Sequence, residues 1–219
     1  MSGVLGPTID ELVIADLPER WSALGFTVAD GACLLGTVRV VMAGPESGRG
    51  IIGWSLRGAA STELDGLPTT ASERPATERA PEQPNGVLAI DHLVAIAPAF
   101  ERSVQALREA GLDLRRVREE PTPAGAPRQA FFRLGEEILE LVAEPGEVSE
   151  RAGGADRPTR FWGLALRTDE MERTVEAFGE HAGPIRPAVQ PGRRIATVRR
   201  SAGLAVPLAL VSSAERRQR

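Results

Sequence analysis

Short apolar runs of strand type alternate along this chain with segments that have the spacing of amphipathic helices. Near the middle, residues 90–96 form an apolar run that predicts a β-strand. Phe100, Val104 and Leu107 follow at i, i+4 and i+7, which places them on one helical face, and Gly111 is well placed to end the helix. The pattern therefore predicts a strand followed by an amphipathic helix.

The same pattern occurs again on both sides of this segment. Downstream, residues 161–166 predict a strand, and Met171, Val175 and Phe178 then repeat the helical spacing. Upstream, residues 9–13 and the short segment after them form a third, shorter copy. Self-similarity of this kind indicates a repeated structural module. Residues 51–57 resemble the strand at 162–167 and are interpreted as the start of a fourth copy that then breaks off.

The ends of the modules repeat as well. Residues 131–135 turn at a glycine and continue into the apolar run 138–142, which is typical of a β-hairpin. Residues 32–42 and 195–211 contain comparable pairs of runs. Each full copy is therefore predicted to have the order β-α-β-β-β. One such module cannot bury its apolar sheet face alone, so we expect two modules to pack around a shared cup.

These copies divide the chain into four parts. Residues 1–67 are expected to hold the degenerate N-terminal module or modules, and residues 68–86, rich in Pro, Thr, Glu and Ala, to form a flexible linker. The paired modules are expected at residues 87–145, called the central module below, and at residues 159–213, called the C-terminal module.

Composition narrows the class of protein. The chain has 219 residues, 42% of them hydrophobic, and a net charge of -4. Its basic residues are all Arg, spread among acids, so we expect no nucleic-acid partner. No apolar run approaches the roughly 20 residues of a membrane span, and Met1 to Gly6 lacks signal-peptide character, so we expect a cytoplasmic protein without a membrane partner. Cys33 is the single cysteine and is expected to be a buried core thiol.

The order of elements, the His in the strand motif at 90–92, the Glu-Arg-Ser helix motif at 101–103 and the closing run at 139–142 resemble the vicinal oxygen chelate superfamily. This is the group of glyoxalases, bleomycin-resistance proteins and extradiol dioxygenases. The resemblance covers residues 87–213 well and residues 8–57 weakly. It implies an α+β fold in which paired βαβββ modules form a curved mixed sheet around a cup.

The resemblance also implies where a divalent metal would be held in that cup. His92 matches the ligand of the first strand, and Glu140 matches the ligand of the last. In the partner module Trp162 stands where a second His is expected, and Ala209 or Leu208 where a carboxylate is expected. Because a catalytic ion usually needs three protein ligands, we expect an incomplete metal site and no cofactor. The alternatives without metal are a buried His92–Glu140 pair and two groups that face a water-filled pocket.

Three functions remain open from the sequence. The first is a binding protein for a small aromatic or anionic ligand, with Trp162 and Trp54 as stacking surfaces and Arg133 for an anionic group. Core filling by the Trp side chains and a solvated Arg133 are the alternatives. The second is a metal-dependent lyase, isomerase or epimerase that acts through a chelated enolate and uses His92 and Glu140. Without a metal, Glu140 alone is a candidate base. The third is a structural or regulatory module. The resemblance also suggests a homodimer, while the ligand and the reaction stay open.

Overall fold

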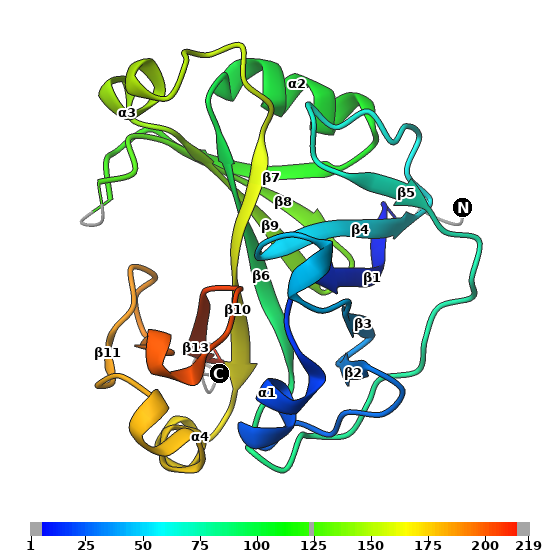
Figure 1. Cartoon of the computed structure of the whole chain (residues 1–219). Helices are drawn as coiled ribbons and strands as arrows, with labels where there is room; N and C mark the ends of the chain where they lie inside the picture. Colours follow the sequence, from blue (N-terminus) through cyan, green and yellow to red (C-terminus); the bar gives the residue numbers. More distant parts are fainter. Residues whose placement is uncertain (1–5, 123–124, 214–219) are drawn as a thin grey trace, which may run out of the picture. The chain divides into compact units, whose positions relative to one another are not determined.

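The structure is a computed structural model that describes residues 6–122 and 125–213. These residues have an α+β fold, with short helices and two β-sheets of mixed strand orientation, one of five strands and one of eight (Figure 1). The chain divides into two compact units. Unit 1 contains Met1–Leu12, Gly53–Pro75 and His92–Trp162, and unit 2 contains Val13–Ile52, Ala76–Asp91 and Gly163–Arg219.

The strands are β1 (Thr8–Ile14), β2 (Ala32–Leu35), β3 (Val38–Met42), β4 (Ile51–Arg57), β5 (Thr69–Ala71), β6 (Ala89–Ala97), β7 (Asp113–Arg118), β8 (Gln129–Leu134), β9 (Glu137–Ala143), β10 (Arg160–Thr168), β11 (Arg186–Pro187), β12 (Arg194–Thr197) and β13 (Leu208–Ser212). The α-helices are α1 (Pro18–Ala23), α2 (Phe100–Glu109), α3 (Gly146–Arg151) and α4 (Met171–Phe178). Three 3₁₀ turns complete the described elements: η1 (Pro45–Ser47), η2 (Gly179–His181) and η3 (Arg200–Ala202).

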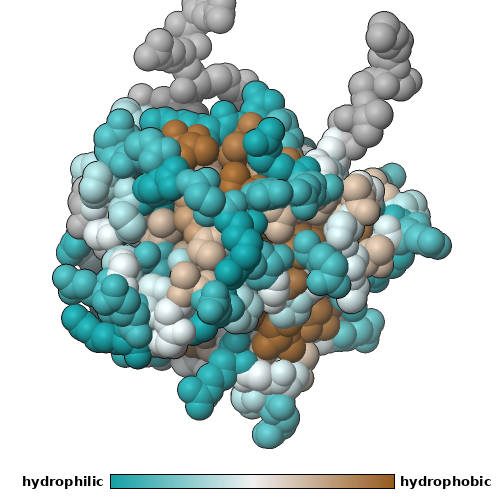
Figure 2. All heavy atoms as spheres, turned by 90° about the horizontal axis from the view of Figure 1, so that it is seen from above, coloured by the Kyte–Doolittle hydropathy of each residue, from teal (hydrophilic) through white to brown (hydrophobic). Residues whose placement is uncertain are grey.

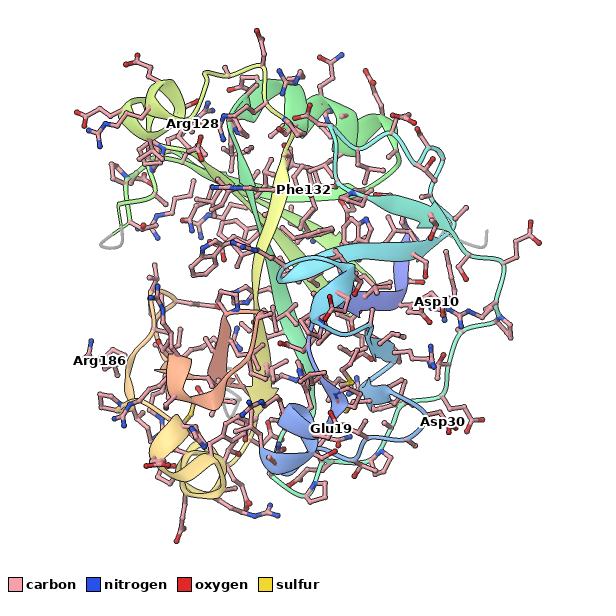
Figure 3. The ribbon with its side chains drawn as sticks, viewed as in Figure 1. Asp10, Glu19, Asp30, Arg128, Phe132 and Arg186 are labelled. Carbon is pink, nitrogen blue, oxygen red and sulfur yellow. The ribbon has the colours of Figure 1, made fainter. Side chains whose placement is uncertain are left out.

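In unit 1, the strands of the central module lie in the order β6-β9-β8-β7. β6 and β9 are parallel, whereas β8 is antiparallel to β9 and β7 is antiparallel to β8. Alternate side chains of these strands are fully buried on one face, and α2 packs against β9 (Figure 1). These buried side chains include Leu93, Leu139, Leu141 and Phe132, the last labelled in Figure 3.

In unit 2, the strands of the C-terminal module lie in the corresponding order, β10-β13-β12-β11. β10 and β13 are parallel, β12 is antiparallel to β13, and β11 is antiparallel to β12. α4 is joined to the end of β10 by a hydrogen bond of 2.7 Å between the hydroxyls of Thr168 and Thr174. In both modules the first strand therefore pairs in parallel with the last, as the predicted β-α-β-β-β order requires.

β4 and β5 pair in the same way as the first and last strands of the C-terminal module. β4 pairs in parallel with β5, with Trp54 opposite Thr69, just as β10 pairs with β13. The amide of Trp54 donates to the carbonyl oxygen of Pro68 at 3.1 Å. In the C-terminal module the amide of Leu164 donates to the carbonyl oxygen of Pro207 at 3.0 Å. β5 thus lies beyond the point where the apolar pattern stops, and an incomplete copy that begins at residue 51 stays a prediction.

The segment expected to be a linker makes specific polar contacts in unit 2. The Gln83 side chain accepts a hydrogen bond from the Thr27 amide (2.8 Å) and donates one to the Leu34 carbonyl (3.0 Å). The Asn85 amide group donates to the carbonyl oxygen of Leu24 at 2.9 Å. Both side chains are buried. The module boundaries inferred from the sequence stay predictions.

A buried carboxylate joins three segments of unit 1. Asp10 on β1, labelled in Figure 3, accepts hydrogen bonds from Arg57, from Arg74 (2.7 Å) and from Ser72 (2.6 Å). Burial alone raises the pKa of Asp10, but the hydrogen bonds from Ser72 and Arg74 and the charges of Arg57 and Arg74 outweigh it, so this pKa lies below its ordinary value.

The face of the molecule in Figure 2 is largely polar. Figure 2 shows hydrophilic residues over most of the face seen from above, interrupted by smaller hydrophobic areas. In residues 6–122 and 125–213, no helix is both long enough and apolar enough to cross a membrane.

Candidate functional site

The structure brings His92 and Glu140 together on neighbouring strands of unit 1. β6 carries His92 and β9 carries Glu140, and the parallel register places Glu140 opposite Val94, two residues beyond His92. The imidazole Nε2 lies 3.5 Å from the carboxylate Oε2. The side chains keep 24% and 15% of their exposure, respectively, so both are accessible to a small molecule.

The two residues belong to one half-buried strand face, opposite the face that carries the core. Strand register defines its members because paired residues, and residues two apart in one strand, point to the same side. From β6 through β9 to β8, the face consists of the row His92, Ile138 and Arg133, the row Val94, Glu140 and Phe131, and the row Ile96, Val142 and Gln129. We call these nine residues the site face. It combines apolar side chains with a few polar groups, which is a common composition of ligand sites.

Gln129 orients Glu140 on this face. Its side-chain Nε2 donates a hydrogen bond to Glu140 Oε1, which leaves Oε2 directed to His92. The carboxamide oxygen of Gln129 is buried and makes no hydrogen bond in the structure. The sequence analysis did not single out Gln129. The hairpin between β8 and β9 was predicted, and its register alone would have placed Gln129 on the face of Glu140.

Arg133 is the exposed member of the site face. It lies in the same row as His92, with Ile138 between them. Its guanidinium Nε donates to the carbonyl oxygen of Gly135 at 2.9 Å, so it keeps other donors for a ligand.

The two Trp residues considered from the sequence lie elsewhere. Trp54 is buried in the core of unit 1, where its indole donates to the Thr69 hydroxyl at 2.7 Å and contacts the Phe161 ring edge-to-face at 5.1 Å. Trp54 thus fills the core, which is the alternative to a stacking surface that the sequence left open. Trp162 is 54% exposed. A stacking role for Trp162 stays a prediction.

The structure corrects the alignment of the two modules by one residue. β6 ends at Ala97 three residues before α2 begins, and β10 ends at Thr168 three residues before α4 begins. Aligned from these ends, His92 corresponds to Gly163 and not to Trp162. Glu140 pairs with Val94, and the corresponding pair in the C-terminal module is Ala165 with Ala209. In the C-terminal module, the positions that correspond to His92 and Glu140 thus hold Gly163 and Ala209, whose side chains cannot bind a metal.

These donors do not fit a resident catalytic metal ion. His92 and Glu140 supply two ligands, whereas three protein ligands are the usual minimum for such a site. In the part of the chain that the structure describes, no three His, Cys, Asp or Glu side chains form a group able to hold a metal. His181 is half-buried in η2, with its Nδ1 3.3 Å from the Ser201 hydroxyl. The chemistry available on the site face is therefore that of an imidazole, a carboxylate and a guanidinium beside apolar side chains.

Comparisons with known proteins agree with this fold. Residues 89–202 match the family described as the Glyoxalase/Bleomycin resistance protein/Dioxygenase superfamily. No match was found among curated proteins.

Solved structures with the same fold include a mutant of 4-hydroxymandelate synthase from Streptomyces coelicolor, with 12% identity and a TM-score of 0.63 over 97% of this chain and 94% of that one. A fusion of a xylose isomerase-like TIM barrel with 4-hydroxyphenylpyruvate dioxygenase has 12% identity and a TM-score of 0.62, over 98% of this chain and 50% of that one. Methylmalonyl-CoA epimerase from Mycobacterium tuberculosis has 18% identity and a TM-score of 0.47, over 59% of this chain and 90% of that one. At 12% identity, the likeness to the first two of these structures concerns the fold alone.

Proposed function

The chain belongs to the Glyoxalase/Bleomycin resistance protein/Dioxygenase superfamily, and we propose that it binds a small anionic or aromatic molecule on the site face of unit 1. One observation carries this proposal: a partly exposed imidazole and carboxylate, 3.5 Å apart, stand on an otherwise largely apolar strand face. Polar groups in such surroundings lose solvation and are stabilised by a ligand that offers complementary groups.

The arrangement of the site face suggests the chemistry of the ligand. Arg133 and His92 flank Ile138 and supply donors for an anionic group. Glu140 accepts a hydrogen bond from a hydroxyl or an N–H group of the ligand. Phe131 stands opposite Glu140 and offers an aromatic surface next to it. A small hydroxylated aromatic acid complements all three features: the cationic donors, the carboxylate and the aromatic surface.

A second candidate is enzymatic, and the placement of Glu140 favours it. Its carboxylate is held by Gln129 and stays accessible, as a general base that removes a proton next to a carbonyl must be. The metal-dependent form of this reaction, through a chelated enolate, needs a third ligand beside His92 and Glu140. In the described residues the chain does not place one there.

Isothermal titration calorimetry with three probes tests the binding proposal. Benzoate offers the anion and the ring, phenol the hydroxyl and the ring, and 4-hydroxybenzoate all three. We expect 4-hydroxybenzoate to bind best. Arg133→Gln should weaken the binding of benzoate about tenfold or more, because a hydrogen bond to a charged group is lost. The affinity for phenol should stay unchanged. Glu140→Gln should weaken the binding of phenol and leave the affinity for benzoate unchanged.

Arg151→Gln provides the matched control, because Arg151 is an exposed arginine of α3 in the same unit. It should bind all three probes like the unchanged protein. Failure of all three probes to bind, or affinities that neither Arg133→Gln nor Glu140→Gln alters, would contradict the proposal.

A further inference from the structure

The strand β7 continues the site face of unit 1 beyond β8 (Figure 1). The two strands are antiparallel, so residues that stand opposite each other point to the same side of the sheet. Arg116 stands opposite Phe131, and Arg118 stands opposite Gln129. Because Phe131 and Gln129 belong to the site face, Arg116 and Arg118 also lie on that side. We call these two residues the β7 arginines.

A β-bulge in β7 gives Arg116 this position. The register shifts between Leu114 and Arg116, so Arg115 is an extra residue in the strand. Without the shift, Arg116 would stand opposite Ala130, which is fully buried in the core. The bulge instead leaves Val117 opposite Ala130 and brings the charged side chain to the site face. Bulges often redirect a side chain in this way next to a functional site.

The guanidinium group of Arg116 is available to a ligand. Arg116 is exposed, and it makes no hydrogen bond or ion pair with any residue that the structure describes. Arg118 lies 3.9 Å from the carboxylate of Glu120, which is beyond hydrogen-bond distance, and the Glu120 side chain is 76% exposed. Arg115, in contrast, is engaged by Asp113 at 3.0 Å. The β7 arginines therefore supply uncommitted donors at this side of the site face.

Arg116 and Arg133 serve different places on the site face. Arg133 stands two residues from Phe131 along β8, diagonally from Arg116, and such diagonal neighbours are about 7–8 Å apart. The Arg133 side chain donates to the carbonyl oxygen of Gly135, which lies further along the chain from Phe131. One carboxylate is too short to bridge such a separation, whereas an aromatic ring that carries two carboxylates spans it.

We propose that the ligand of the site face is an aromatic acid with two carboxylate groups, and that Arg116 binds the second of them. This inference rests on the proposed function, in which Arg133 and His92 bind the first. The guanidinium fork of Arg116 matches the two oxygens of a carboxylate. Arg118 adds positive charge beside it, which favours an anion there. Phe131, opposite Arg116, offers its surface to the ring between the two carboxylates.

Calorimetric titration of the full chain with benzoate, isophthalate and terephthalate, at constant ionic strength, tests this inference. We expect the better of the two dicarboxylates to bind about tenfold or more tightly than benzoate, because a second charge-assisted hydrogen bond forms. Arg116→Gln should abolish this preference and leave the affinity for benzoate unchanged. Arg108→Gln is the matched control and should keep the preference, because Arg108 is an exposed arginine of α2 in the same unit.

The result for benzoate separates this inference from the proposed function. If benzoate binds through Arg133 and neither dicarboxylate binds more tightly, the inference is wrong and the proposed function stands. A preference that Arg116→Gln and Arg108→Gln reduce equally reflects overall charge and would also overturn the inference. If none of the three acids binds, both proposals are wrong.

Circular dichroism of each variant establishes that it is folded. Arg116→Lys keeps the positive charge but loses the planar fork, so it provides a second variant if Arg116→Gln does not fold. It should lower the preference for the dicarboxylate, and an unchanged preference in Arg116→Lys would contradict recognition by the guanidinium group.

Discussion

Gly163 occupies in the C-terminal module the position that His92 occupies in the central module, and it lies directly against the backbone of Pro207. A Cβ atom at Gly163 would stand 2.7 Å from the Pro207 carbonyl oxygen, closer than Cβ atoms approach other heavy atoms in proteins. The corresponding Gly53 is less crowded, because a Cβ atom there would stand 3.4 Å from the Pro68 carbonyl oxygen. The tight packing at Gly163 excludes a second histidine ligand at this position.

Gly163→Ala should therefore destabilise the protein, by about 1–3 kcal/mol, because the added methyl group forces β10 and β13 apart. Gly53→Ala is the matched control and should change the free energy of unfolding by less than about 1 kcal/mol. Urea denaturation followed by circular dichroism measures both. Equal losses in the two variants would show that the approach to Pro207 is not what requires glycine.

Metal binding should depend on adding a third donor to His92 and Glu140. Val94 lies directly opposite Glu140 on the site face, so Val94→His should raise zinc affinity about tenfold or more, as measured by competition with a chromogenic chelator. Ile96→His, two residues further along the same face, is the control and should bind zinc like the unchanged protein. Stoichiometric metal in the purified protein that His92→Ala removes would instead favour the metal-dependent enzyme.

Loss of the Asp10 carboxylate should be costly because it removes the ion pair between Asp10 and Arg57, both of which are largely buried. Asp10→Ala is expected to lower the free energy of unfolding by about 3–5 kcal/mol at neutral pH. Asp113→Ala removes an exposed ion pair with Arg115 and should cost at most about 1 kcal/mol. Urea midpoints of the two variants compare these losses, and similar values would contradict the prediction.

The contribution of Asp10 should also depend on pH. Its pKa in the folded protein lies below the ordinary value, so folding favours the ionised form. This stabilisation is complete above the pKa in the unfolded chain, about 3.9, and is lost as the pH falls through the lower pKa of the folded state. The difference in urea midpoint between Asp10→Ala and the unchanged protein should therefore narrow on acidification below about pH 4. A constant difference would indicate that the charge of Asp10 does not contribute.

Cys33 should not react with thiol reagents in the folded protein. It is fully buried, and burial raises the pKa of its thiol to about 12, so the thiolate that attacks such reagents is scarce at pH 8. We expect Ellman's reagent to label it only after denaturation with guanidinium chloride. Rapid labelling of the native protein would mean that this part of unit 2 opens readily.

The repeated module could be predicted from the sequence because its signals are local. The recurrence of Phe100, Val104 and Leu107 in Met171, Val175 and Phe178 identified the helices, and the family match and the described fold confirm the resemblance and its α+β architecture. Strand position is harder to infer, because apolar runs look alike after a shift of one residue while every side chain changes face. That shift aligned Trp162 with His92.

Other features were missed because they depend on distant partners. β5 consists of Thr69, Thr70 and Ala71, which show no apolar pattern, and it exists through its pairing with β4. Gln83 lies in a Pro-rich segment and is buried by contacts with residues about 50 positions away. Such contacts leave no periodic signal in the segment itself.

The paired glycine and proline positions reveal the size of the unit that the chain repeats. Gly53 lies next to the Pro68 carbonyl and Gly163 next to the Pro207 carbonyl. In the other two copies, Asp10 and Asp91 stand one residue before the position of these glycines, and each accepts hydrogen bonds from arginine. Counted along the chain, the first predicted copy therefore resembles the third, and the second resembles the fourth. We therefore predict that the chain repeats with a period of two modules, and that adjacent modules are the two dissimilar halves of this repeat.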